Sequence, residues 1–594
     1  MKAKQKQYAI GVDYGTNSVR ALVVDLADGA ELASATFAYP SGEDGVLVSA
    51  KDPQLARQNP ADYLAGFLDV VAKAIKQAAR ADKAFKAAHV VGIGVDTTGS
   101  TPIPVDKAGM PLALKPKFAK NPNAHAWLWK DHTAHAEAAA ITEAAKKAGV
   151  PYLDKCGGTY SSEWFWSKIW HCLNVDKAVF DAAFSWVELC DFIPAWLCGD
   201  TDPLTLRRGI CAAGHKAMFS AEWGGLPSKE FLAALSPRLA ELRDRLYTQA
   251  VPSDWPAGRL SREIADQVGL PAGIAVAVGA FDAHHGAVGS GVKPGTLVKI
   301  VGTSTCDIMV APAGAKVADI PGVCGIVPGS VLPGHLAVEA GQSAVGDIFK
   351  WYVDKHLPAA HAKGNPYASL EKEAARLAPG ESGLLALDWH NGNRTILVDP
   401  LLTGGIVGLT LRTTPAEIYR ALVEETAFGA LVIVQRVEKY GIKIKEVVTC
   451  GGLAEKSPFM MQIYADVTGR PIRIGVSWPS SINWLAVCRM RSSSPGQRTS
   501  TPCAEICVIV PILPLYQRFS AAVSLRTNST WAPSFSSSSA AVGKAYSGKS
   551  PSMLAMNRWR APGSASRRAR LTASARLLWV HRVMQPSSGT KSGA

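Results

Sequence analysis

A strand–turn–strand segment near the start of the chain places the strongest constraint on the fold. Residues 8–25 read YAIGVDYGTNSVRALVVD, in which two apolar runs flank a small polar turn. This pattern predicts a tight β-hairpin, and Glu31–Ala38 is predicted as the strand that follows it. Gly15 allows a ligand to approach the backbone closely, and Thr16 and Asn17 add side-chain donors for an anion. An ordinary hairpin with a polar turn is the simpler alternative.

Asp13 lies beside this turn, where a carboxylate alone would repel an anion. The two features are compatible if a divalent cation lies between them, because Mg²⁺ is typically held by one or two carboxylates together with phosphate oxygens. The segment therefore predicts a phosphate-binding turn with Asp13 as its metal-binding neighbour.

The same pattern occurs again in the second half of the chain. Residues 297–310 read LVKIVGTSTCDIMV, with Gly302 and Thr303 at the turn between two apolar runs. Two halves that begin alike predict two related domains, with the ligand site in the cleft between them. The pattern at Pro415–Lys439 predicts a long amphipathic helix. The pair Gly451–Gly452, between an apolar strand and the predicted helix Pro458–Thr468, is a third place where backbone can approach a phosphate or nucleotide.

Length and charge define the parts of the chain. A chain of 594 residues is too long for one core. Residues 475–594 hold 15 of the 63 Lys and Arg residues but only one acid, Glu505, so the whole net charge of +14 lies there. The first 474 residues are neutral overall, which argues against binding of nucleic acid by bulk electrostatic attraction.

Other features of the composition indicate where the protein works. No apolar run approaches the roughly 18–20 residues of a membrane helix. The opening residues MKAKQKQ lack the apolar segment of a signal peptide. The eleven cysteines have no zinc or redox spacing, as is typical of reduced thiols. We therefore expect a cytoplasmic protein that does not bind a membrane, and a homodimer is compatible with the sequence.

Polar residues follow several predicted strands. The strand that starts at His89 ends in Asp96, Thr97, Thr98 and Gly99, where ligands bind in open α/β sheets, although a plain exit into a loop is the alternative. Asp282 follows the apolar run 274–278, a position that suits a general base. It could equally cap the next helix, and both roles can hold.

Further polar and aromatic residues admit two interpretations. The segments 121–134 and 161–170 carry tryptophans that could stack on a sugar or pack in a core. Lys216 is expected in a loop among small residues, where an exposed lysine is the simpler reading. The adjacent pair His284 and His285 suggests a metal site, but neighbouring residues point in different directions.

These segments together resemble a known family. DYGTNSVRALVVD, VGTSTCD and CGGLAEKSPFMMQIYAD resemble the phosphate and adenosine segments of the sugar kinase, actin and heat-shock-70 superfamily. GGIVGLTLRTTPAEIYRALVE resembles a signature of the FGGY carbohydrate kinases. VDTTGSTPIPVD, NPNAHAWLWKDHTA, YSSEWFWSKIW and GTSTCDIM resemble the members that act on L-ribulose. The resemblance runs from about residue 8 to residue 474.

The resemblance implies an α/β fold of two ribonuclease-H-like, or actin-like ATPase, domains with a catalytic cleft between them. We expect residues 1–290 to form the sugar- and phosphate-binding domain, and residues 291–474 the nucleotide-side domain. The implied reaction is transfer of the γ-phosphate of ATP, with Mg²⁺, to the C5 hydroxyl of L-ribulose in L-arabinose catabolism. Another pentulose or polyol kinase, or a non-catalytic sugar-binding protein on the same fold, is the alternative.

The resemblance also implies roles for individual residues. Asp282 would accept the hydroxyl proton, and Asp13 would orient Mg²⁺ on the nucleotide. The other positions that match the motifs are sugar contacts (Gly99, Lys216, Asp282 and Glu339) and phosphate or nucleotide contacts (Gly15, Thr16, Asn17, Arg20, Gly302, Thr303, Gly451 and Gly452).

The family pattern stops after Ile474. In place of an Ala/Gly-rich helix beside the nucleotide, residues 475–594 are rich in Ser, Arg and Trp, with almost no acids. We interpret this segment as translation in a shifted reading frame from about Gly475. A disordered basic tail is the alternative. The absent segment would cover part of the second core and the adenine side of the cleft, so we expect this chain to be poorly stable and impaired in activity.

Overall fold

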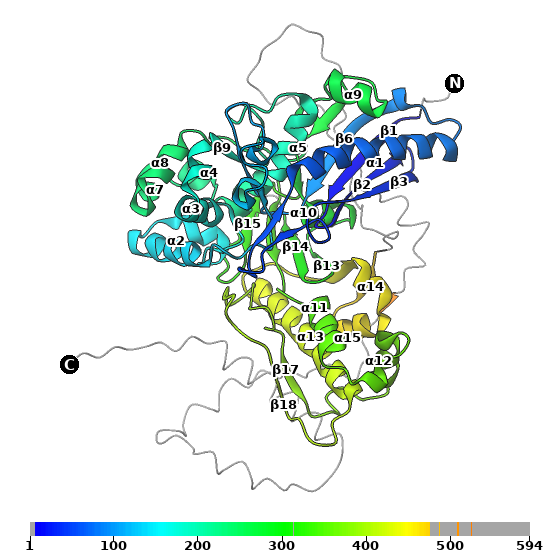
Figure 1. Ribbon diagram of the computed structural model, residues 1–594. Coiled ribbons are helices and arrows are strands. Elements are labelled where there is room, and N and C mark those ends of the chain that lie inside the picture. Colours follow the sequence, from blue (N-terminus) through cyan, green and yellow to red (C-terminus); the bar gives the residue numbers. More distant parts are fainter. Residues whose placement is uncertain (1–5, 313, 476–485, 488–507, 510–523, 526–594) are drawn as a thin grey trace, which may run out of the picture.

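The computed structural model describes residues 6–312 and 314–475, together with the strands β21 (Ala486–Val487), β22 (Val508–Ile509) and β23 (Ser524–Leu525). It contains two seven-stranded sheets, one in each half of the chain (Figure 1). The shifted frame or basic tail expected for 475–594 lies almost entirely outside the described residues.

The opening segment forms the hairpin that its sequence predicts. Strands β1 and β2 pair antiparallel, and β3 continues the sheet with the predicted bounds. Strand β6 then pairs parallel to β1. The order in this sheet is β10-β11-β6-β1-β2-β3, and β12 also pairs with β6. Its strands are β1 (Tyr8–Tyr14), β2 (Ser18–Asp25), β3 (Glu31–Ala38), β6 (Val90–Thr97), β10 (Pro256–Arg259), β11 (Ala275–Ala277) and β12 (Ala280–Phe281).

The second sheet repeats this arrangement. Strand β14 pairs antiparallel with both β13 and β16, and β19 pairs parallel to β13 as β6 does to β1. The order is β15-β16-β14-β13-β19-β20-β23. Besides β23, the strands of this sheet are β13 (Thr296–Val301), β14 (Thr305–Ala311), β15 (Gly325–Pro328), β16 (Leu336–Ala340), β19 (Glu446–Cys450) and β20 (Ile472–Ile474). The expectation of two related units is confirmed.

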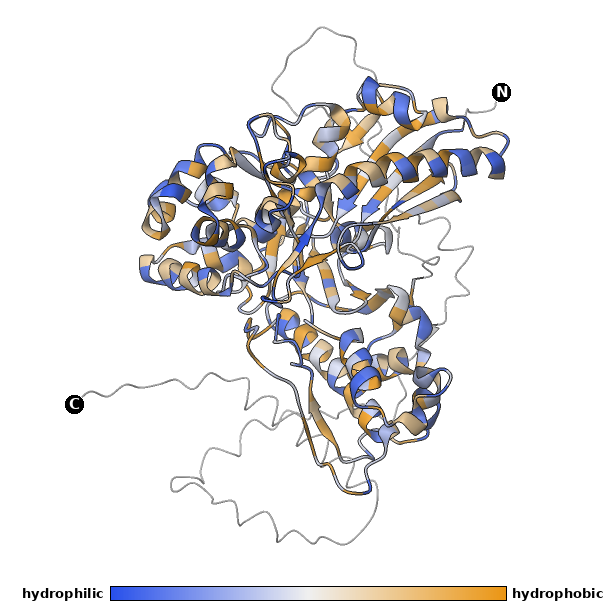
Figure 2. Cartoon of the chain, in the orientation of Figure 1, coloured by the Kyte–Doolittle hydropathy of each residue, from blue (hydrophilic) through white to orange (hydrophobic). Residues whose placement is uncertain are grey.

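One long amphipathic helix covers each sheet. Helix α1 (Pro60–Ala81) begins at Asn59, whose side chain accepts a hydrogen bond from the backbone of Ala61, and its apolar face packs into the first core. Helix α13 (Pro415–Lys439) has the predicted bounds and a capping box between Thr414 and Glu417. Helices around the sheets carry both hydrophilic and hydrophobic residues, as their half-buried positions require (Figure 2).

The remaining helices fall into two groups (Figure 1). Those of the first half are α2 (His135–Ala148), α3 (Phe165–Val175), α4 (Lys177–Ala182), α5 (Leu189–Cys198), α6 (Ile210–Lys216), α7 (Lys229–Leu235), α8 (Pro237–Arg243), α9 (Arg262–Val268) and α10 (Asp282–Gly289). Those of the second are α11 (Gly346–Lys355), α12 (Pro366–Ala374), α14 (Gly452–Lys456) and α15 (Pro458–Thr468).

Short strands complete the fold. They are β4 (Leu47–Val48), β5 (Ala56–Gln58), β7 (Pro102–Val105), β8 (Ala126–Trp127), β9 (Ser185–Glu188), β17 (Leu385–Leu387) and β18 (Gly405–Val407). Within the described ranges, no helix combines the length and apolar character that a membrane crossing requires.

The expectation that Lys216 lies in an exposed loop is wrong. Lys216 is the last residue of α6 and is buried. The small residues around it serve helix packing, because a Cβ atom at Gly214 would lie only 2.3 Å from Val327 Cγ1 on β15. Glycine therefore lets α6 approach the edge of the second sheet closely.

Candidate active site

A cavity of about 850 Å³ lies where residues of the two halves of the chain meet. It brings together every site residue that the sequence indicated. Among its lining residues are Asp13, Gly15, Thr16, Asn17, Arg20, Gly99, Lys216, Asp282, Gly302, Thr303, Glu339, Gly451 and Gly452. The cavity is thus built from both turns, from the Gly451–Gly452 pair and from the ends of strands in both sheets.

Three carboxylates gather at one edge of the first sheet. Asp13 on β1 is directly opposite Asp96 on the parallel strand β6. Strand β12 also runs parallel to β6 and delivers Asp282 immediately after Phe281. Because parallel strands end at the same edge of a sheet, these side chains meet there. Asp282 is the first residue of α10 rather than its cap, and its carboxylate accepts a 2.6 Å hydrogen bond from the N–H of Ala283.

Burial disfavours negative charge on these carboxylates. It raises the pKa of Asp13 to about 6, although the guanidinium of Arg20, 3.5 Å away, acts in the opposite direction. Burial, and then repulsion from Asp13, raise the pKa of Asp282 to about 7. The pKa of Asp96 lies well above its ordinary value for the same reasons. Among the described residues, Asp96 Oδ1 has no hydrogen-bond partner.

Hydrogen bonds within the protein fix the first turn. The N–H of Gly15 donates to the carbonyl of Ser18 at 3.0 Å. Trp129 donates through its indole N–H to Thr16 Oγ1 at 3.1 Å. The side-chain amide of Asn17 donates to the carbonyl of Asp44 at 2.6 Å, so this amide nitrogen already has a partner in the protein.

The glycines predicted to contact the nucleotide leave room for a ligand. A Cβ atom at Gly302 or Gly452 would meet nothing within 4 Å. Gly451 has φ 102°, and a Cβ atom there would lie 2.3 Å from the carbonyl oxygen of Val301. Only glycine therefore allows the end of β19 to lie against the end of β13. The helix that follows is the short α14, which begins at Gly452 and precedes the predicted α15.

The part of the cavity where the sequence predicted sugar contacts contains an ion pair between the two halves. Lys216 Nζ lies 2.7 Å from Glu339 Oε1 on β16 and 5.4 Å from the ring centre of Trp164. Burial acts to lower the pKa of Lys216, but the Glu339 carboxylate more than offsets this effect. Burial acts to raise the pKa of Glu339, which Lys216 nevertheless holds below its ordinary value. Gly99 is required beside this pair, because a Cβ atom would overlap the ring of Phe281.

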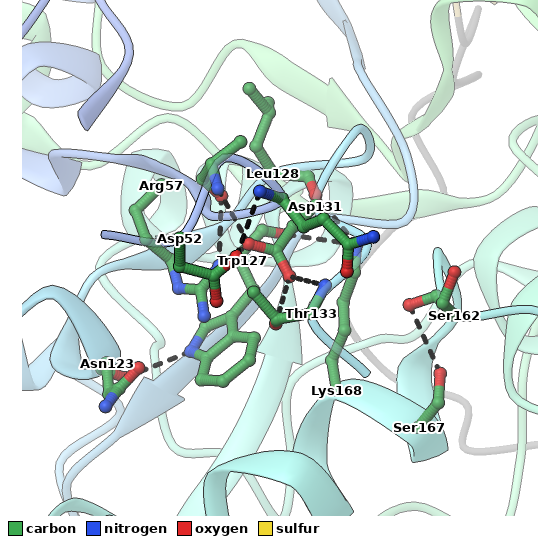
Figure 3. Close-up of polar contacts among 12 residues, drawn as sticks. Asp52, Arg57, Asn123, Trp127, Leu128, Asp131, Thr133, Ser162, Ser167 and Lys168 are labelled. Atoms are coloured by element: carbon green, nitrogen blue, oxygen red, sulfur yellow. Dashed lines mark hydrogen bonds and ion pairs between the residues drawn. The ribbon is translucent and has the colours of Figure 1, made fainter. Parts of the chain in front are cut away.

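A buried polar network supports the loop that carries Trp129 (Figure 3). Arg57 and Asp131 form an ion pair in which both side chains are at most 1% exposed. The guanidinium also lies 3.4 Å from the ring centre of Trp127. Lys168 donates to the carbonyls of Leu128 and Ser100, each at 2.8 Å. The tryptophans of this segment thus serve the core and the turn.

Lys168 also links this loop to the strand-end segment beside Gly99. Lys168 donates to the carbonyl of Ser100. Beside this contact, Glu188 accepts two hydrogen bonds, one from the hydroxyl of Ser100 and one from the N–H of Thr101 at 2.7 Å. The backbone that carries Gly99 is therefore held by buried side chains from α3 and β9.

Three residues at the site were not predicted in the positions where the structure places them, namely Asp96, His215 and His284. Asp96 belonged to a recognised strand-end cluster, and its register with Asp13 identifies it. His284 Nε2 lies 3.5 Å from Glu339 Oε2, whereas His285 Nδ1 lies 3.9 Å from Asp96 Oδ2, so the adjacent histidines do point in different directions. His215 had no signal apart from its position beside Lys216.

The donor set fits a divalent cation and a nucleotide. Asp13, Asp96 and Asp282 supply the hard carboxylate oxygens that Mg²⁺ prefers, and Asp96 Oδ1 still lacks a partner among the described residues. The open faces of Gly302 and Gly452 offer backbone to phosphate groups.

Comparison with solved structures identifies the fold. The chain superposes on xylulose kinase from Rhodospirillum rubrum with a TM-score of 0.64 at 23% identity, covering 79% of this chain and 86% of that one. Plasmodium falciparum glycerol kinase matches with a TM-score of 0.62 at 15% identity, over 79% and 86% of the two chains. The protein has the two-domain, actin-like fold of sugar kinases.

Sequence comparison identifies the family. Residues 8–289 match the N-terminal domain, and residues 297–478 the C-terminal domain, of the FGGY family of carbohydrate kinases. The chain is 45% identical over 485 residues to a ribulokinase of Vibrio parahaemolyticus, which covers 79% of this chain and 84% of the relative. A ribulokinase of Geobacillus thermodenitrificans is 44% identical, over 80% and 83% of the two chains. The protein belongs to the FGGY family of carbohydrate kinases and is an ATP-dependent sugar kinase by descent.

Proposed function

We propose that the protein transfers the γ-phosphate of ATP to the C5 hydroxyl of L-ribulose. The observation that carries this proposal is the shared cavity of Asp282 and the Lys216–Glu339 ion pair, which offers a base and two charged groups to one polyol. The relatives at 44–45% identity, both ribulokinases, support L-ribulose over another pentulose or polyol. Because ATP is the donor, we place the reaction in the cytoplasm.

The mechanism follows from where these side chains lie. Asp282 accepts the proton of the attacking hydroxyl, and its pKa of about 7 matches a base that works near neutral pH. Lys216 donates to sugar oxygens while Glu339 accepts from sugar hydroxyls, so the pair fixes one orientation of the polyol. Asp13, with Asp96 beside it, would hold Mg²⁺, which neutralises charge on the transferred phosphate.

The other proposed roles complete the site. Arg20 and the first turn would contact the transferred phosphate, and Gly302, Thr303, Gly451 and Gly452 the nucleotide. Glycine at position 99 leaves space for the ring of Phe281 beside the proposed sugar site. We assign residues 1–290 to the sugar- and phosphate-binding domain and residues 291–474 to the nucleotide-side domain. The departure from the family pattern after Ile474 leads us to propose that turnover by this chain is impaired.

A substrate panel tests the proposal. The purified 594-residue chain is given ATP, MgCl₂ and L-ribulose, D-ribulose, D-xylulose or glycerol. ADP release is coupled to NADH oxidation, and sugar binding is followed by tryptophan fluorescence. We expect the tightest binding and the highest kcat/KM with L-ribulose, at a kcat below the roughly 1–100 per second of other kinases.

Two results would contradict the proposal. Preference for another sugar would replace the substrate, and sugar binding without ADP release above the background of the Asp282→Asn variant would favour a non-catalytic sugar-binding protein. Turnover at the full rate of other kinases would instead refute the proposed impairment.

A further inference from the structure

Two buried histidines face the oxygen of Glu339 that Lys216 does not contact. His215 Nδ1 lies 3.2 Å, and His284 Nε2 3.5 Å, from Glu339 Oε2. The centres of the two imidazole rings are 4.5 Å apart. Both histidines are nearly fully buried. The carboxylate is therefore held at Oε1 by the ammonium group and flanked at Oε2 by imidazole nitrogens.

The fold is shaped to admit these rings. Gly325 on β15 pairs with Glu339 on β16, and a Cβ atom at Gly325 would lie 1.9 Å from His215 Nδ1. The absence of a side chain at Gly325 thus opens a space for the imidazole directly beside Glu339. His215 Nε2 lies 2.9 Å from Ser330 Oγ, which orients Nδ1 toward the carboxylate.

The histidines and the carboxylate come from different halves of the chain. His215 ends α6 beside Lys216, and His284 lies in α10, both before residue 290, whereas Glu339 and Ser330 belong to the second half. The imidazoles therefore contact Glu339 from across the boundary between the halves. In the part of the chain that the structure describes, His215 Nδ1, His284 Nε2 and Glu339 Oε2 form no hydrogen bond, so each of these buried polar atoms has only the other two as its polar neighbours at this end of the cavity.

The charges argue against a metal site at this cluster. The three ligand atoms lie within 4.8 Å of one another, as a bound cation would require. However, the Lys216 ammonium is 2.7 Å from the other oxygen of the same carboxylate, and a second cation would be repelled by it. Burial lowers the pKa of His284 to about 4 and that of His215 well below its ordinary value, so both rings are neutral.

We propose that His215 and His284 are positioning residues that fix the orientation of Glu339 and thereby set the affinity for the sugar. A glutamate side chain has several rotatable bonds, so Lys216 alone restrains one oxygen and leaves the other free to turn. Contacts on Oε2 hold the carboxylate plane in the orientation that accepts from a sugar hydroxyl. This inference rests on the proposed function, because it assigns the sugar to this end of the cavity.

A double-mutant cycle tests the proposal. The variants are His215→Ala, His284→Ala and Glu339→Gln, with each histidine variant also made in the Glu339→Gln background. Dissociation constants for L-ribulose are measured by tryptophan fluorescence, since Trp164 lies next to Lys216. Dissociation constants for ATP and melting temperatures are measured on the same proteins. Binding is the readout, so the test does not depend on the turnover of the chain.

We expect each histidine substitution to weaken L-ribulose binding by about 5- to 30-fold in the parent and less than about twofold in the Glu339→Gln background, as coupled residues do. ATP binding stays within about twofold. His171→Ala is the matched control, because His171 forms a similar pair with Glu137, at 3.0 Å, outside the cavity. This variant leaves L-ribulose binding unchanged.

Three results would overturn the proposal. Equal weakening in both backgrounds would mean that the histidines act without Glu339, and unchanged sugar binding would mean that they do not act at all. A transition metal that survives chelation at one per chain, and is lost in His215→Ala, would make the cluster a metal site. Failure of the parent to bind any sugar of the panel contradicts the proposed function first, whereas binding without coupling contradicts only the positioning role.

Discussion

The buried ion pair between Arg57 and Asp131 allows a quantitative prediction for the first half of the chain. Asp131 is fully buried and accepts from the Arg57 guanidinium, from the N–H of Ala56 at 2.7 Å and from the hydroxyl of Thr133 at 2.6 Å. The Asp131→Ala substitution removes all of these acceptors. It leaves a guanidinium that is 1% exposed without its carboxylate.

The expected cost follows from this burial. Breaking a buried pair by removing one partner costs about 3–5 kcal/mol, because the remaining charge cannot be solvated. The ring of Trp127 beneath Arg57 recovers a part of this, while the unpaired N–H and hydroxyl donors each add about 1–3 kcal/mol. We therefore expect a loss of at least about 3 kcal/mol, or a melting temperature lower by about 6–20 °C.

Unfolding by heat and by guanidinium is followed by tryptophan fluorescence. Trp127 lies beside the substituted pair and contributes to this signal. The matched control is Asp69→Ala, which breaks the 2.7 Å pair with Lys73 on the surface, where the side chains are 29% and 55% exposed. The control loses less than about 1 kcal/mol. If Asp131→Ala is as mild as Asp69→Ala, the reasoning from burial is refuted.

Three further predictions concern the site. Burial, and then Asp13, raise the pKa of Asp282 to about 7, so this proposed base is protonated below that pH. We therefore expect kcat/KM to rise as the pH increases through about 7. An acidic limb near pH 4 would contradict this. In the absence of nucleotide, MgCl₂ at about ten times its Kd stabilises the protein by about 1.4 kcal/mol, which raises its melting temperature. EDTA reverses this rise, and NaCl of equal ionic strength does not produce it. Gly325→Ala places a Cβ atom 1.9 Å from His215 Nδ1 and weakens L-ribulose binding by about tenfold. The control is Gly405→Ala, whose Cβ atom meets nothing within 4 Å and which leaves this binding unchanged. Equal affinities of the two variants would count against a role for the space that Gly325 leaves beside His215.

The parts of the fold that depend on local pattern were predictable from the sequence. The hairpin at 8–25, the strand Glu31–Ala38 and the helix Pro415–Lys439 have the predicted bounds, because each combines one hydrophobic period with clear turn or cap residues. The two sheets also repeat one arrangement, as the recurrence of strand, Gly-Thr turn and strand indicated.

The site was predictable where a motif marks it and not where only tertiary packing does. Asp13 and Asp282 stand at strand ends, a position that a sequence reveals. The role of Asp96 depends on its register with Asp13, which is a property of the sheet. The burial of Lys216 depends on the contact of α6 with a strand more than a hundred residues later, and no local pattern encodes that contact.

The histidines illustrate the same limit more sharply. The sequence places His284 and His285 side by side, but the structure turns one toward Glu339 and the other toward Asp96. His215 is useful only because Gly325, on a separate strand, leaves space for its ring. A sequence without its fold cannot show which glycine faces which imidazole.

The ion pair between Lys216 and Glu339 joins residues 123 positions apart, one from each half of the chain. At the proposed site, the sugar would be bound by groups whose separation is set by how the two sheets are placed relative to each other. The affinity of the protein for the sugar therefore depends on how the two sheets are placed, and measuring it reports on that placement. A nucleotide, or a substitution far from the sugar, that alters the angle between the halves will register as a change in sugar affinity without contacting the sugar.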